Sequence, residues 1–169
     1  MKEVSHTMKL SAATMLAMLL GSYLYSSSVD AAELRDISKV NGGIRVSSDA
    51  TLHGSLTTVN GGIQTNPGTE IERRVSTVNG KIRLRDTRVG EDVQTSNGDI
   101  FLTDGSIIEG DIVVKGRRSW LNRIFGFEGR NSRIIIDSNS AVRGDIHLYR
   151  EVDLDIADGA EVGDVIEHF

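Results

Sequence analysis

A short phrase of the form Val-Asn-Gly-x-Ile recurs along the chain with nearly constant spacing. It first appears as Val40-Asn41-Gly42-Gly43-Ile44. Later copies contain the same Asn, and the spacings are 19, 19 and 18 residues between Asn41, Asn60, Asn79 and Asn97. A fixed period of this length indicates a repeat architecture, in which each repeat stacks on its neighbour to bury a continuous core.

A second pattern has the same period. It consists of two apolar residues four positions apart, as in Leu52 and Leu56. Its first members are 19, 18, 19, 34 and 20 residues apart: Leu52, Ile71, Val89, Ile108, Val142 and Val162. The step of 34 equals one repeat plus about sixteen further residues, which predicts an insertion between Ile108 and Val142.

Apolar and polar residues alternate within each repeat, as in Ile44-Arg45-Val46 and Ile82-Arg83-Leu84. A period of two is that of a β-strand. The sequence therefore predicts an all-β fold, a single-stranded right-handed parallel β-helix (solenoid) of about six rungs of 18–19 residues. The Asn-Gly pairs are predicted to form corners, because both residues tolerate a left-handed backbone conformation.

Equivalent residues of successive rungs are expected to stack into columns with a spacing of about 4.8 Å. One predicted internal column consists of Ile44, Ile63, Ile82 and Ile100. The first members of the second pattern form another. The four Asn residues form a predicted amide ladder, which we interpret as a structural corner, with an exposed recognition stripe as the alternative.

The first thirty residues have the layout of a secretory signal. Lys2 and Lys9 precede an uncharged segment from Leu10 to Val29, and small residues follow up to Ala31. We expect cleavage after Ala31, which gives a signal peptide at 1–31 and a β-helix domain at 32–169. The alternative is an uncleaved membrane anchor. The chain has no Cys and therefore no lipobox, and we expect a periplasmic or secreted protein with no stable membrane span after cleavage.

The insertion at 115–130 is basic and aromatic. It has five positive residues and one negative residue, and it carries the only Trp of the chain. Such a segment is a candidate binding surface, with the residues Arg117, Arg118, Trp120, Arg123, Phe125 and Phe127. The alternative is a lid that covers the last rungs, because residues 131–169 contain three positive and nine negative residues.

The repeats show no catalytic constellation. No Cys is available as a nucleophile, and no Gly-x-Ser-x-Gly motif or phosphate-binding loop occurs. His53, His147 and His168 fall in different repeat columns, so we do not expect them to converge on a metal ion. We therefore expect no enzymatic activity, no catalytic residues, no metal and no cofactor.

Three aspartates share one slot of the repeat: Asp92, Asp111 and Asp145. Neighbouring carboxylates could hold a cation such as Ca²⁺. The alternative, which we favour, is a column of solvated corner residues, with Arg74 of the preceding rung as a partner.

These residues resemble a known group of proteins. The stacked Val-Asn-Gly-x-Ile phrases, the Trp-bearing interruption and the closing phrase around Val142-Arg143-Gly144-Asp145-Ile146 are similar to those of exported proteobacterial β-helix proteins of the adhesin type. The resemblance covers roughly 34–165 and extends distantly to bactofilins, which form polymers. It implies a β-helix fold but no functional residues. Bactofilins normally lack a signal peptide, so the leader of this chain argues against a cytoskeletal role.

The expected function is that of an exported, non-enzymatic, structural or adhesin-like β-solenoid. The main alternative is a carbohydrate-binding or carbohydrate-active envelope protein, because polysaccharide enzymes also use this fold. A third is a periplasmic factor that binds a protein through the solenoid edge. We expect an envelope protein or polysaccharide as partner and self-association through the solenoid ends. The net charge of −5 indicates no bulk attraction to nucleic acid.

Overall fold

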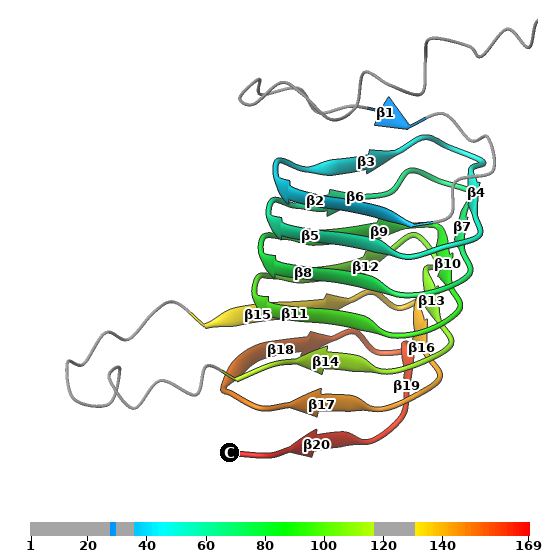
Figure 1. The fold of residues 1–169 in the computed structure, drawn as a ribbon. Helices are drawn as coiled ribbons and strands as arrows, with labels where there is room; N and C mark the ends of the chain where they lie inside the picture. The colour runs from blue at the N-terminus through cyan, green and yellow to red at the C-terminus, as the bar shows by residue number, and fades with distance from the viewer. Residues whose placement is uncertain (1–27, 30–35, 117–130) are drawn as a thin grey trace, which may run out of the picture.

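The computed structural model of the chain describes residues 28–29, 36–116 and 131–169. Every regular element in these residues is a β-strand, and the chain winds into a right-handed coil of six turns (Figure 1). Each turn contributes one strand to each of three parallel sheets, which we name A, B and C. The predicted fold class, a parallel β-solenoid of about six rungs, is therefore confirmed.

Each turn runs from sheet B to sheet A and then to sheet C. Sheet B contains β2 (Ile37–Asn41), β5 (Leu56–Asn60), β8 (Val75–Asn79), β11 (Val93–Asn97), β14 (Ile112–Val114), β17 (Ile146–Leu148) and β20 (Val165–Glu167). Sheet A contains β1 (Ser28–Val29), β3 (Ile44–Val46), β6 (Ile63–Gln64), β9 (Ile82–Arg85), β12 (Ile100–Thr103), β15 (Ser132–Ile136) and β18 (Val152–Ile156). Sheet C contains β4 (Thr51–Leu52), β7 (Thr69–Ile71), β10 (Thr87–Val89), β13 (Ile107–Ile108), β16 (Ala141–Val142) and β19 (Glu161–Val162).

The predicted internal columns are confirmed. In sheet A, Ile82 pairs with Ile63 on one side and with Ile100 on the other, and all three side chains are buried. In sheet C, Leu52 pairs with Ile71, and the column continues through each later turn to Val162. The strands of the middle turns bury alternate side chains, so the interior of these turns is filled mainly by stacked Ile, Leu and Val.

Hydroxyl groups occupy one internal corner, between sheets A and C. The buried residues Thr69, Thr87, Ser106 and Ser140 lie there in successive turns. The backbone N–H of Thr87 donates to the Ser106 hydroxyl at 3.3 Å, and that of Ser106 donates to the Ser140 hydroxyl at 3.2 Å. Within the sheets, backbone N–H and C=O groups of neighbouring strands bond to each other. At the corner the backbone turns, so the side-chain hydroxyl groups supply hydrogen-bond partners there.

The Asn ladder is confirmed as a structural corner between sheets B and A. Each side-chain amide donates to the amide oxygen of the preceding turn, at 3.2, 3.0 and 3.0 Å, through Asn41, Asn60, Asn79 and Asn97. In the next turn the insertion replaces this corner. Arg150 reaches back from the sixth turn and donates from Nη1 to the Oδ1 atom of Asn97 at 2.9 Å. The guanidinium group thereby completes the ladder where the repeat is broken.

The predicted reason for glycine at this corner is wrong for three of its four copies. Only Gly42 has a positive φ, of 95°. At Gly61, Gly80 and Gly98 an added Cβ would instead collide with a backbone carbonyl of the preceding turn. The left-handed residues lie at the opposite corner, between sheets A and C, and include Asp49, Asp86 and Asp104. Glycine at the Asn-Gly corner therefore permits close stacking of turns rather than a special backbone angle.

In the sequence, the insertion lies between β14 and β15. The backbone N–H of Lys115 still donates to the Thr95 carbonyl at 2.8 Å, so the solenoid continues to this residue. The segment from 117 to 130 lies outside the described residues, and so do the six candidate binding residues that the sequence placed in it. Whether this segment acts as a lid or as a binding surface stays a prediction.

The predicted signal peptide also lies almost entirely outside the described residues. Its described part is β1, which pairs in parallel with β3 through Ser28 and Arg45. Cleavage after Ala31 would remove this strand and leave β3 at the edge of sheet A. No helix in the described part of the chain is long and apolar enough to cross a membrane.

Candidate binding groove on sheet A

A shallow groove lies on the outer face of sheet A, over its first three full turns. Its volume is about 180 Å³. Two glycines, Gly43 and Gly62, lie next to each other in adjacent turns and line the groove, and a Cβ at either position would press against the carbonyl of the following turn. The outward side chains of β3, β6 and β9 are Arg45, Gln64 and Arg83, which pair in register across the turns and line the same groove.

The groove is positively charged. Lys81, Arg45 and Arg83 line it, and no Asp or Glu does. Lys81 is partly neutralised by Asp99, whose Oδ2 atom lies 3.5 Å from Nζ. In the part of the chain that the structure describes, no carboxylate lies within 4.0 Å of Arg45 or Arg83. These two guanidinium groups lie two turns apart, with Gln64 in the turn between them, and can therefore bind an anionic ligand.

An aromatic ring borders the groove on the next turn. Phe101 of β12 pairs with Arg83 of β9, and the Arg83 guanidinium carbon lies 5.4 Å from the centre of the ring. The Lys81 ammonium lies 6.0 Å from the same centre. These cation–π distances orient the two basic side chains along the face of the sheet. The ring adds a half-exposed apolar surface beside the charged groups.

The charge of the outer face of sheet A changes sign along the coil. The column that begins with Arg45 continues through Phe101 to Ile135 of β15 and Asp155 of β18. Asp153 also lies on β18. The early turns of this face thus carry basic side chains, and the last turn carries Asp153 and Asp155.

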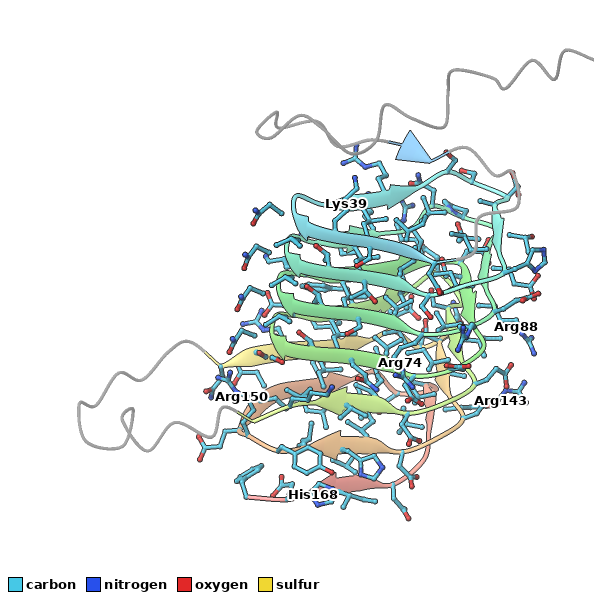
Figure 2. All side chains as sticks on the ribbon, viewed as in Figure 1. Lys39, Arg74, Arg88, Arg143, Arg150 and His168 are labelled. Carbon is cyan, nitrogen blue, oxygen red and sulfur yellow. The ribbon has the colours of Figure 1, made fainter. Side chains whose placement is uncertain are left out.

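Sheet C carries a different arrangement, in which the charges neutralise each other. Arg88 and Arg143 lie along the same side of the coil (Figure 2). Glu109, in the turn between them, pairs with Arg88 at 2.5 Å and with Arg143 at 3.2 Å. Both cations share Glu109, and Glu70 lies in register beside Arg88, so two carboxylates face the two cations and this side is a less favourable anion site than the groove.

The aspartate column is a structural corner, as favoured from the sequence. The Oδ1 atom of Asp111 accepts a hydrogen bond from the backbone N–H of Asp145 at 2.9 Å. Asp92 accepts in the same way from Asp111, and Asp145 from Asp164. Arg74 lies 3.5 Å from Asp92, as expected (Figure 2). The carboxylates are used to tie one turn to the next, and no group of three metal-ligating side chains occurs among the described residues.

The structure brings two histidines together, although they lie in different repeat columns as expected. His147 lies on β17, and His168 directly follows β20. The Nδ1 atom of His147 lies 3.1 Å from the Nε2 atom of His168. Their spacing of 21 residues differs from the repeat period, so they do not occupy one column. The contact is diagonal, because His147 pairs with Ile166 rather than with His168. His53 lies elsewhere, beside Glu72.

The groove could not be found from the motifs alone. The relevant signal is the pair Gly42-Gly43, repeated as Gly61-Gly62, where later copies have Lys81 or Asp99 in the second position. Two successive turns without a side chain at that position leave a gap in the outer face. Arg150 was also missed, because its contact with Asn97 spans the insertion.

Comparison of the chain with family models, with curated proteins and with solved structures found no match.

Proposed function

We propose that the protein is an exported, non-enzymatic, adhesin-like scaffold that binds an acidic polysaccharide of the cell envelope through the groove on sheet A. The observation that carries this proposal is the groove itself, with Arg45 and Arg83 on either side of Gln64 above a floor of glycine. Carboxylate groups of uronic acid sugars match the guanidinium geometry.

The shape of the groove favours an extended ligand. It crosses three successive turns, which repeat at about 4.8 Å, so a polymer laid across the strands meets charged or polar side chains at regular intervals. The amide of Gln64 can bind a sugar hydroxyl between the two guanidinium groups, and Phe101 offers an apolar face to a sugar ring. Both features suit carbohydrate better than a small inorganic anion.

The carbohydrate-active alternative is less well supported by this groove. Glycoside hydrolysis generally needs two carboxyl groups on opposite sides of the scissile bond. None of the side chains that line the groove is Asp or Glu. The geometry therefore favours binding of the polymer over its cleavage.

The groove is tested with two double variants that have the same net charge. Arg45→Ser/Arg83→Ser removes the two groove cations. Arg73→Ser/Arg143→Ser is the control, because it removes two cations outside the groove. Each glutamate that loses a partner keeps another: Glu91 keeps Arg74, and Glu109 keeps Arg88. Binding to polygalacturonate is measured by titration calorimetry, with neutral dextran as the reference polymer.

We expect the groove variant to bind polygalacturonate at least about tenfold more weakly than the parent, since each charged hydrogen bond contributes about 1.5–3 kcal/mol. The control variant should bind within about twofold of the parent. Equal losses in both variants, or equal binding of dextran by the parent, would contradict the proposal.

Export is tested separately. Mature protein isolated from the envelope should begin near Ala32 when its mass is measured. A product that retains residues 10–29 would instead indicate an anchored protein.

A further inference from the structure

We propose that His147 and His168 form a binding site for a divalent transition-metal ion that prefers imidazole, such as Zn²⁺. The site lies at the last turns of sheet B, where β17 and β20 pair in parallel. His168 follows β20, and its backbone N–H donates to the Leu148 carbonyl at 2.8 Å. Figure 2 shows His168 at the C-terminal end of the coil.

The separation of the two ring nitrogens suits a shared metal ion. His147 Nδ1 and His168 Nε2 are 3.1 Å apart. In a tetrahedral zinc site the metal–nitrogen bonds are about 2.0–2.1 Å, which places two ligand nitrogens about 3.3 Å apart. The ring centroids are 5.4 Å apart, so the two rings face each other nearly in line and both must tilt to direct their lone pairs at one ion.

A carboxylate orients the first ring. His147 Nε2 lies 3.6 Å from Asp111 Oδ2, on the side of the ring away from His168. Asp111 is itself held by the Asp145 backbone N–H, which donates to its Oδ1 atom at 2.9 Å. A carboxylate beside one imidazole nitrogen favours a proton there, so that the other nitrogen presents its lone pair. In this tautomer Nδ1 of His147 accepts the hydrogen bond from Nε2–H of His168, and metal binding requires the His168 proton to move to its Nδ1 atom, so that both facing nitrogens present lone pairs.

The second ring is held by stacking. The Tyr149 and His168 rings are 4.3 Å apart and only 9° from parallel. His168 is thus positioned from one side by Tyr149 and from the other by its contact with His147. Neighbouring groups thus hold the two rings next to each other before any ion binds, which lowers the cost of bringing the ligands together.

The site is open to solvent. The His147 side chain is 25% exposed, and no third His, Cys, Asp or Glu joins the pair in the described residues. Water molecules would complete the coordination of the ion. Binding should therefore be weaker than at a four-ligand structural zinc site, and it should tie β20 to β17 at the acidic end of the coil.

Zn²⁺ is added to protein without an affinity tag, and binding is measured by titration calorimetry and by thermal melting. We expect one Zn²⁺ per chain and a higher melting temperature in its presence. His147→Ala and His168→Ala should each weaken binding by at least about tenfold. His53→Ala is the matched control and should bind like the parent. Mg²⁺ should have no effect, because it prefers oxygen ligands.

A second measurement does not depend on the stability of the variants. Substoichiometric Cu²⁺ is added to the parent protein, and the imidazole NMR signals are followed. The His147 and His168 signals should broaden before that of His53. No binding of Zn²⁺, equal losses in the His53→Ala control, or uniform broadening of all histidine signals would overturn the proposal.

Discussion

At the scale of single residues, the position of a side chain in the repeat determines which chemistry it meets. Inward positions are filled by Ile, Leu and Val that are almost completely buried, and the outward neighbours are free to vary. Ile82 illustrates the inward case, since it is 0% exposed and stacks between Ile63 and Ile100. A substitution at Ile82 therefore changes the packing of three turns.

Replacement of Ile82 by Asp should destabilise the protein by several kcal/mol, because it buries an unpaired charge in an apolar column. The measurement is the midpoint of thermal or urea unfolding. Ser76→Asp, at an outward position of β8, is the control and should unfold close to the parent. If Ile82→Asp unfolds like the parent, the register of sheet A is not as described.

The stability of the protein should also depend on Asp137. Burial opposes its ionisation, but hydrogen bonds from the Ser140 hydroxyl and from the backbone N–H groups of Asp104, Asn139 and Ser140 outweigh this and lower the pKa below its ordinary value of 3.8. A lowered pKa in the folded state stabilises the fold above the ordinary pKa, and this contribution is lost as the pH falls through the folded value.

Asp137→Asn should therefore lower the free energy of unfolding at neutral pH. As the pH falls from roughly 5 to 2, the free energy of unfolding of the variant should decrease less than that of the parent. Urea unfolding at a series of pH values measures both effects. Asp158→Asn, at an exposed turn, is the control. Parallel stability curves for the parent and Asp137→Asn would show that this carboxylate does not contribute.

The internal residues could be predicted from the sequence because the repeat places them in register, as with Ile82 and Ile100. The outward sites could not, since they depend on which neighbours lack a side chain or lie diagonally. The groove arises from Gly43 and Gly62 in adjacent turns, and the histidine pair from a spacing of 21 residues. Neither feature has a motif that marks it within one repeat.

At the scale of elements, the fifth turn is the irregular one. Its strands β14 and β15 pair normally with their neighbours, although the insertion separates them in sequence. Removal of 117–130 would leave the corner Lys115-Gly116-Asn131. This corner has the same length as Tyr149-Arg150-Glu151, which connects β17 to β18 in the following turn. The solenoid should therefore still close without the insertion.

We expect the deletion of 117–130 to preserve the strand content and to convert the protein into larger assemblies. The reason is that the last turn is less well covered than the others: Val152, Leu154 and Ile156 are only half-buried. Open sheet edges and apolar surface promote association. Light scattering at low and high salt is the measurement. A deletion variant of unchanged size would contradict the lid hypothesis and favour the insertion as a binding surface.

At the scale of the whole molecule, the interior is filled and the surface is divided. In the first described turn, the side chains of Ile44, Val46 and Leu52 are buried in the core. At the far end of the coil, Val165 and Phe169 are exposed. Sheet A is basic near the start and acidic near the end, and sheet C is neutralised by ion pairs. The interior of the described turns is filled by packed side chains, so we expect a ligand to bind on an outer face.

The most direct test of this account is to map the binding site by NMR with a galacturonate oligosaccharide. The chain of 18.4 kDa is small enough for backbone amide signals to be assigned. The account predicts that the largest shifts occur at Gly43, Gly62 and the strands that carry Arg45 and Arg83, and that the shifts shrink as salt is added. Shifts centred on sheet C or on the last turn, or no shifts at all, would contradict it.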